Sequence, residues 1–291
     1  MFKRLSYKKQ EKVIVFLFLL VPLMFLIVFT FLPALYMFRL SFVEWNGFSG
    51  VKKWVGLANY IEIFKNPDYF KPLLNSLYYF FGGLLQLVIA FYLAVLLNSK
   101  IKGKSIFKAL YFFPFLLNGV AVSLIFIFFF RPDGTLDSIL KVLGMGGFIQ
   151  QWLGNSKIIN FSLAGVSIWR YIGLNFIVFL GAIQSVSPEV IEAADLDGAS
   201  EWQKVLYITL PSVRSIMELN FILTISGAIS VFEIPYIMTS GANGSSTFVI
   251  QTVNTAFKFQ QVGLGSAMAM VVLVIVGIAT IIQNRFFKEA E

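Results

Sequence analysis

The stretch from Val13 to Phe38 is a run of 26 almost uncharged, mostly apolar residues. A helix needs about 20 such residues to cross a bilayer, whereas the apolar region of a cleaved secretory signal has only ~7 to 15. The run is therefore predicted to be a retained transmembrane helix. Its excess length predicts tilt, or a kink at Pro22 or Pro33.

The composition of the whole chain fits the same class of protein. Hydrophobic residues make up 58% of the sequence and charged residues 13%, against about 45–50% apolar and about 25% charged in soluble domains. We therefore expect an integral membrane protein. The net charge of +8 is better explained by orientation in a membrane, and no nucleic-acid partner is expected, because such a partner would require a folded basic face.

Histidine and cysteine are absent from the sequence. Their absence excludes imidazole acid–base catalysis, Cys/His metal sites, thiol nucleophiles and disulfides, and no metal site is predicted. A carboxylate or Ser–Lys active site stays formally open. The sequence contains no GxxxxGK[ST] phosphate-binding loop, so the chain is expected to have no ATPase activity of its own.

Five further apolar runs follow the first, and together they predict an all-α polytopic membrane protein with six transmembrane helices. The predicted spans are residues 13–38, 73–97, 106–130, 161–185, 212–238, which is broken near its end by Pro235, and 266–282. Six spans place both termini on one side. The segments on that side hold 13 Lys and Arg against 9 in the longer opposite connections, so both termini are predicted to be cytoplasmic.

A polar segment, Ser187 to Pro211, separates the fourth and fifth predicted spans and holds five of the fifteen Asp and Glu residues. Its chemistry predicts two short helices. The leading serine caps the first helix with Pro188 at its first position, and Gly198 supplies the turn. Ser200 and Gln203 form a capping box for the second helix, and the closing proline ends that helix or kinks it into the next span.

The spacing within this segment resembles the EAA loop of permease subunits in binding-protein-dependent ABC importers. The matching residues are Glu192, Ala193, Ala194, Gly198, Ile208, Thr209, Leu210 and Pro211. The alternative is an ordinary loop whose acids keep it soluble, but a plain loop does not require glycine and proline at these positions. We call residues 187–211 the EAA segment.

The resemblance extends over nearly the whole chain and is strongest to sugar-type permeases, in particular the maltose-transporter F-like member of a permease pair. Other similar positions are Ser41, Phe42, Trp45, residues 55–60, Asn75, Ser76, residues 111–114 and 133–136, Trp169 and residues 239–241. Some residues depart from the family pattern, such as Glu233 in place of a frequent Asp. These departures affect the inference about the substrate and not the inference about the family.

The resemblance implies a type I importer permease fold with a cytoplasmic EAA coupling loop. The implied organisation is a basic cytoplasmic tail (1–12), a first transmembrane helix (13–38), an extracytoplasmic connection (39–71), a five-helix type-1 transmembrane domain (72–284) and a cytoplasmic tail (285–291). The first short helix of the EAA segment would dock on a separate ATPase. The implied coupling residues are Glu192, Ala193, Ala194, Asp197, Gly198, Ile208, Leu210 and Pro211.

The partners implied by the resemblance are a second permease subunit, two ATPase subunits, an extracellular solute-binding protein and a carbohydrate substrate. ATP and magnesium would be bound by the ATPase, and no cofactor by this chain. The implied location is the bacterial cell membrane. The chain is expected to be a transport subunit that translocates a sugar or oligosaccharide and not an enzyme.

Three ionisable residues lie within or at the edge of the predicted spans: Arg170, Glu218 and Glu233. Because a charge at the bilayer centre costs at least ~2.5 to 3.5 kcal/mol, such groups usually face a cavity or a partner. For Arg170 and Glu233, pairing with each other and contact with substrate stay equally open. Glu218 lies about two helical turns beyond the closing proline of the EAA segment, within reach of the cytoplasmic interface.

Recognition of a sugar requires hydrogen-bonding groups that match its hydroxyls and an aromatic face for the ring. The fourth and fifth spans offer such groups, although packing between helices is the simpler role for each taken singly. The substrate-pathway candidates are Trp169, Arg170, Tyr171, Asn175, Thr224, Ser230 and Glu233.

Three other functions are less consistent with the sequence. An importer of glycerol-3-phosphate or another polyol derivative should need more converging cations than the lone intramembrane Arg170. An ion-coupled secondary transporter should show inverted repeats, and no repeat is evident in the sequence. An intramembrane enzyme is weaker still, because no closely spaced pair of carboxylates accompanies the missing His and Cys.

Overall fold

The computed structural model describes residues 7–98 and 103–288. Within these residues, five helical stretches are long and apolar enough to cross a membrane, and a bent helix pair makes a sixth if it counts as one span. The chain divides into two compact units, residues 1–66 with 252–271 and residues 67–251 with 272–291. The predicted tails, residues 1–12 and 285–291, lie partly outside the described residues.

The first unit contains the predicted first span as α1 (Tyr7–Leu26), the π-helical turn η2 (Ile27–Phe31) and α2 (Leu32–Leu40). The candidate span is 30 residues long, about 45 Å at 1.5 Å per residue. Helix α1 continues through Pro22, whereas η2 ends two residues before Pro33. Because a proline ring clashes with the carbonyl group four residues earlier, the wider π turn provides room for Pro33.

The first unit also holds a small hairpin, β1 (Val43–Glu44) and β2 (Lys53–Trp54), and the short helix α3 (Ala58–Lys65). The strands are antiparallel, with Val43 opposite Trp54. The start of α15 (Val262–Lys288) presses against β1: a Cβ added to Gly263 would lie 1.8 Å from the carbonyl oxygen of Val43. The chain therefore needs a glycine at this crossing.

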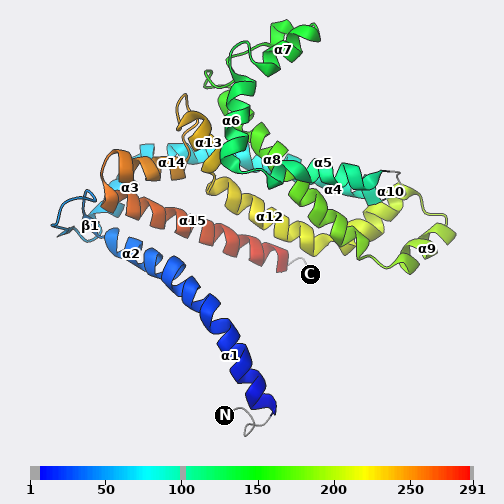
Figure 1. The fold of residues 1–291 in the computed structure, drawn as a ribbon, viewed down its shortest axis with the longest axis horizontal. Helices are drawn as coiled ribbons and strands as arrows, with labels where there is room; N and C mark the ends of the chain where they lie inside the picture. Colours follow the sequence, from blue (N-terminus) through cyan, green and yellow to red (C-terminus); the bar gives the residue numbers. More distant parts are fainter. Residues whose placement is uncertain (1–6, 99–102, 289–291) are drawn as a thin grey trace. The chain divides into compact units, whose positions relative to one another are not determined.

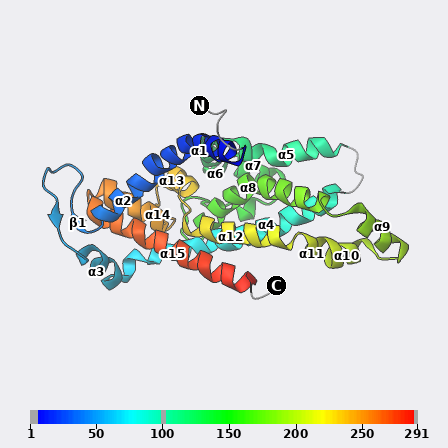
Figure 2. The ribbon, with the colours of Figure 1, turned by 90° about the horizontal axis from the view of Figure 1, so that it is seen from below.

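The second unit is a bundle in which α4 (Ser76–Asn98) packs against α8 (Ile159–Gln184) and α12 (Arg214–Ile229), as Figures 1 and 2 show. Helix α5 (Lys104–Leu116) crosses α8 where Gly173 would place a Cβ 1.9 Å from the carbonyl oxygen of Tyr111. Gly83 similarly accommodates the methyl group of Thr224. The buried core at one end of this bundle is formed by Ala90, Ala94, Phe176, Phe179, Ile183 and Val213.

The predicted third span, residues 106–130, is wrong as a single helix. Helices α5 and α6 (Gly119–Phe130) meet at 97°. Pro114 removes one backbone donor near the end of α5, and Leu117 is extended. The Asn118 side chain then accepts a hydrogen bond from the Val120 N–H at 2.8 Å and caps the new helix.

The fifth span is interrupted at a different place from the predicted one. Helix α12 ends at Ile229 and α13 (Glu233–Thr239) follows, so the break covers residues 230–232 and precedes Pro235. Pro235 lies in the first turn of α13, where its missing N–H would have had no helical partner. The proline is therefore accommodated in the first turn of a helix and does not break one.

The remaining predicted spans correspond to helices with shifted ends. The second is the stretch Pro67–Asn98, which comprises η3 (Pro67–Tyr69), η4 (Lys71–Asn75) and α4, and the sixth is Val262–Arg285 within α15. The connections carry α7 (Thr135–Val142), η5 (Gly146–Phe148), α14 (Phe248–Val253) and η7 (Asn254–Lys258).

Candidate functional site

The EAA segment begins with helix α9 (Pro188–Leu196), with Pro188 at its first position as predicted. The predicted capping bond from Ser187 to the helix backbone is not formed. Its hydroxyl donates instead to the carboxylate of Glu189, and this hydrogen bond lowers the pKa of Glu189. The start of α9 is therefore fixed by the proline and not by a side-chain cap.

The turn after α9 confirms the predicted role of Gly198. Its φ is +77°, in the region that residues with a Cβ rarely adopt. The N–H of Ala199 donates to the carbonyl oxygen of Ala194 at 2.9 Å, and the N–H of Gly198 donates to that of Asp195 at 3.1 Å. This pattern is a Schellman motif, so the glycine both ends α9 and satisfies its last carbonyl groups.

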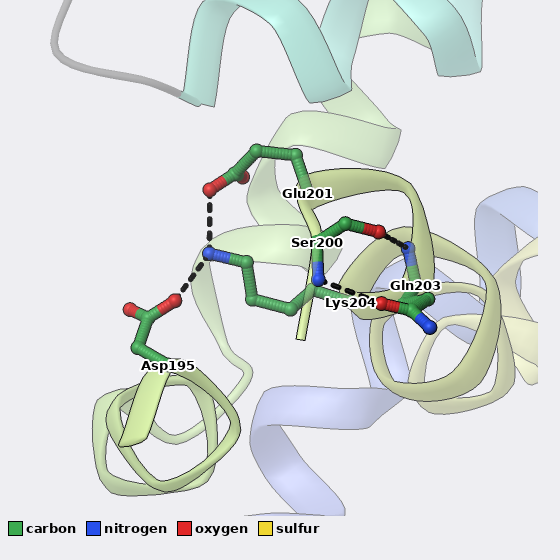
Figure 3. Close-up of polar contacts among 5 residues, drawn as sticks. All are labelled: Asp195, Ser200, Glu201, Gln203 and Lys204. Atoms are coloured by element: carbon green, nitrogen blue, oxygen red, sulfur yellow. Dashed lines mark hydrogen bonds and ion pairs between the residues drawn. The ribbon is translucent and has the colours of Figure 1, made fainter. Parts of the chain in front are cut away.

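The predicted capping box is present at the start of α10 (Glu201–Lys204). The N–H of Ser200 donates to Oε1 of Gln203 at 2.7 Å, and the N–H of Gln203 donates to Oγ of Ser200 at 3.4 Å (Figure 3). These two bonds fix the direction in which the chain leaves the Gly198 turn.

A residue that sequence reasoning missed, Lys204, lies between the two short helices. Its side chain is 9% exposed, and Nζ donates to Asp195 on α9 and to Glu201 on α10, each at 2.6 Å (Figure 3). The hydrogen bond to Asp195, followed by that to Glu201, raises the pKa of Lys204. The i,i+3 pair with Glu201 could have been read from the sequence, but the pair with Asp195 depends on the fold of the turn.

The segment ends in a distorted helix, as its closing proline predicts. A π-helical stretch, η6 (Val205–Thr209), precedes α11 (Leu210–Ser212), and the chain bends at Val213 before α12. Thr209 and Val213 are buried, which anchors this end of the segment in the bundle.

The implied coupling residues lie mainly on the outside of the hairpin formed by α9 and α10. Glu192, Ala193 and Asp197 are exposed, while Ala194 is half-buried. Several large apolar side chains are exposed beside them: Val190, Leu196, Trp202, Leu206 and Tyr207. A hollow of about 290 Å³ opens behind Gly198. Exposed apolar side chains grouped with charges are typical of a protein interaction surface.

The second candidate region lies where the break between α5 and α6 meets the break between α12 and α13. Arg170 of α8 donates from Nη1 to Oε2 of Glu233 at 2.6 Å, with the arginine side chain 12% exposed and the glutamate 44% exposed. The Glu233 carboxylate lies at the N-terminus of α6, so close that a Cβ on Gly119 would come within 2.2 Å of it. The helix dipole favours a negative charge at this position.

Arg170 and Glu233 therefore form an ion pair with each other, which is one of the two alternatives that the sequence left open. The guanidinium carbon of Arg170 also lies 5.1 Å from the ring centre of Tyr171, and its Nε is buried without a partner. Of the seven substrate-pathway candidates, these three lie together.

The other four candidates have individual surroundings. Trp169 packs edge-on against Phe126 with ring centres 5.1 Å apart, and Asn175 is half-buried on α8. Thr224 donates to the carbonyl oxygen of Asn220 at 2.8 Å, and Ser230 donates to that of Ser226. Both hydroxyls are therefore bound to their own helix. Glu218, proposed to reach the cytoplasmic interface, pairs with Arg214 at 2.7 Å.

The family-like residue Asn75 and the buried residue Asp137 have clear structural roles. Asn75 donates to the carbonyl oxygens of Gly244 and Ser246 at 2.9 and 2.7 Å, and so holds the loop after α13. Asp137 is buried at the start of α7 and accepts hydrogen bonds from Trp152 Nε1 and the Asp133 N–H at 2.8 and 2.9 Å. Within the described part of the chain, no three His, Cys, Asp or Glu side chains are grouped to hold a metal.

Comparison with known proteins identifies the family to which this chain belongs. The family model described as "Binding-protein-dependent transport system inner membrane component" matches residues 86–290. The chain is 33% identical to the probable ABC transporter permease protein YurN of Bacillus subtilis, over 96% of this chain and 97% of that protein. It is 30% identical to the multiple sugar-binding transport system permease protein MsmF of Streptococcus mutans, with coverage of 94% and 95%.

A solved structure shows the same fold. A chain in the crystal structure of a bacterial alginate ABC transporter, in complex with an alginate pentasaccharide-bound periplasmic protein, aligns with a TM-score of 0.83 at 17% identity, covering 99% of this chain and 98% of that one. The architecture is therefore that of an ABC transporter permease. The chain is a multi-pass membrane protein that belongs to the family of binding-protein-dependent transport system inner membrane components, which are transport components and not enzymes.

Proposed function

We propose that this chain is the permease subunit of an ATP-driven importer whose cargo is a sugar or oligosaccharide. The similarity to MsmF over nearly the full length of both proteins supports a carbohydrate cargo. The observation that carries the coupling role is the α9–α10 hairpin, which presents Glu192 and exposed apolar side chains around the Gly198 turn.

In this proposal the EAA segment and both termini lie in the cytoplasm, where α9 docks on an ATPase subunit. The complete importer contains this chain, a second permease, two ATPase subunits and an extracellular solute-binding protein. ATP and Mg²⁺ are bound by the ATPase subunits. Closure of those subunits moves α9, and the movement passes through η6 and α11 into the spanning helix α12.

The substrate pathway runs past the pair of Arg170 and Glu233, at the breaks between α5 and α6 and between α12 and α13. Glu233 is 44% exposed, so its second carboxylate oxygen can accept a hydrogen bond from a sugar hydroxyl. Because Arg170 already holds a carboxylate, it is not a free cation for a phosphate group. This arrangement favours a neutral sugar over glycerol-3-phosphate.

The experiment is uptake of radiolabelled sugars, with glycerol-3-phosphate as a competitor, into vesicles that contain the complete importer. We expect uptake to require ATP and to continue when ion gradients are collapsed. Glu192→Lys or Gly198→Pro should abolish uptake while the subunit remains inserted and expressed. Uptake that follows an ion gradient without ATP, or that is unchanged in both variants, would refute the proposed function.

A further inference from the structure

Helix α9 is connected to α8 by residues 185–187 and to α10 by the Gly198 turn. None of its nine residues is buried, so apolar packing contributes little to its orientation. A helix of this length is also marginal on its own in water. Its position therefore depends on these two chain connections and on polar contacts made across the Gly198 turn.

Lys204 makes the cross-helix contact. Its side chain is 9% exposed, and it reaches Asp195 on α9 at 2.6 Å. A lysine can bury its aliphatic stem while its ammonium group binds acceptors at the edge. Lys204 thus connects the exposed helix α9 to the end of α10, and the chain that follows α10 is held in the bundle.

The backbone after Lys204 leads directly into the membrane-spanning core. Stretch η6 starts at Val205, and Thr209 and Val213 are buried further along. Val213 belongs to the apolar core that α4 and α8 share. A displacement of α9 can therefore reach α12 by two routes. One is the backbone of the Gly198 turn, and the other is the ion pair of Lys204 with Asp195.

We propose that Lys204 is a positioning residue for coupling, which holds α9 against α10 so that movement of the ATPase is transmitted to the spanning helices. This role rests on the proposed function of the EAA segment. The ion pair with Asp195 carries it, because that pair joins two helices. The pair with Glu201 lies within α10 and contributes only to the local helix.

The structure provides a matched control for this distinction. Asp195→Asn and Glu201→Gln each replace a carboxylate by an amide, and each removes an ion pair of 2.6 Å to the same ammonium group. Only the first variant removes a bond between α9 and α10. Lys204→Arg keeps the positive charge, whereas Lys204→Met keeps a similar apolar stem and removes the charge.

The experiment measures two quantities on the purified complete importer in proteoliposomes: hydrogen exchange of the α9 backbone amides, and sugar molecules transported per ATP hydrolysed. For Lys204→Met and Asp195→Asn we expect exchange to accelerate about three- to tenfold, the range for one charge-assisted hydrogen bond weakened by solvent screening. Transport per ATP should fall by a similar factor. Glu201→Gln and Lys204→Arg should stay near the wild type in both measurements.

Each other outcome has a distinct meaning. Equal effects of Asp195→Asn and Glu201→Gln would refute the cross-helix role. Faster exchange with unchanged transport per ATP would show that Lys204 is only structural, and no change in either measurement for Lys204→Met would also overturn the proposal. Glu192→Lys, tested in parallel, separates these results from failure of the proposed function, since that failure would leave Glu192→Lys fully active. If the importer with Lys204→Met does not assemble, the measurements on Asp195→Asn alone decide whether the proposal holds.

Discussion

Two ion pairs in the second unit share one design and differ in their surroundings. In each, a nearly buried cation faces a half-exposed carboxylate: Lys204 (9% exposed) with Asp195 (54%), and Arg170 (12%) with Glu233 (44%). The first pair joins two short helices outside the candidate spans, and the second joins the middle of the candidate spanning helix α8 to the start of α13, just after the break that follows α12. Whether a pair lies in water or in the membrane should therefore determine how much it contributes to stability, because an unpaired charge costs more in an apolar environment.

The largest effect should come from breaking the intramembrane pair. Arg170→Met leaves the Glu233 carboxylate without its cation, and we expect a loss of about 3 kcal/mol, the lower end for a buried pair because the carboxylate is half-exposed. Thermal melting of the purified subunit in detergent measures this loss. The double variant with Glu233→Leu should recover most of it. If the double variant is no more stable than Arg170→Met, the two residues are not coupled.

A smaller effect is expected from crowding the same pair. In Gly119→Ala the new Cβ would lie within 2.2 Å of the Glu233 carboxylate, so the carboxylate must move, at a cost of about 1 to 3 kcal/mol. Gly165→Ala on α8 is the matched control, since nothing lies within 4 Å of its Cβ. Equal melting temperatures for the two variants would contradict the placement of Glu233 against α6.

The corresponding backbone change in the hairpin is Gly198→Ala. A Cβ at φ +77° is strained by about 1 to 2 kcal/mol, although it meets no neighbouring atom. We expect faster hydrogen exchange in α9 with little change in overall melting. Gly181→Ala, in the regular helix α8 with open space around its Cβ, serves as the control and should leave α9 exchange unchanged.

The smallest effect concerns pH. The pKa of Lys204 is raised above its ordinary 10.5 by hydrogen bonding to Asp195 and then to Glu201. A raised lysine pKa contributes stability that is fully present below 10.5 and is lost as pH rises through the folded-state value. After correction for the intrinsic pH dependence of exchange, α9 protection should therefore be flat from neutral pH to about pH 9. A decline within that interval would show that another group controls the hairpin.

The same comparison shows what the sequence could and could not predict. Within the EAA segment the decisive contacts are three to five residues apart, so the Gly198 turn, the Ser200 capping box and the bend beyond Pro211 follow from local chemistry. The pair of Lys204 and Asp195 spans nine residues across a turn and was missed.

In the bundle, pairing is set by packing over long distances along the chain. Arg170 and Glu233 are 63 residues apart, and Asn75 reaches Gly244 over 169 residues. Hydrophobicity located the apolar run at 106–130 but gave no indication of its 97° bend, because both halves of that run are apolar. Pro114 and the capping Asn118 were the available indications of the break.

The most direct test of the coupling role uses the absence of native cysteine in this chain. Ala193→Cys places a single thiol on the exposed face of α9, and Val142→Cys places one on α7, where the native side chain is 87% exposed. In membranes containing the complete importer, the first thiol should cross-link to the ATPase subunit and react only with reagents that reach the cytoplasm. The second should react only from outside. A thiol at position 193 that is modified from outside, or that never cross-links in an assembled importer, would contradict the account.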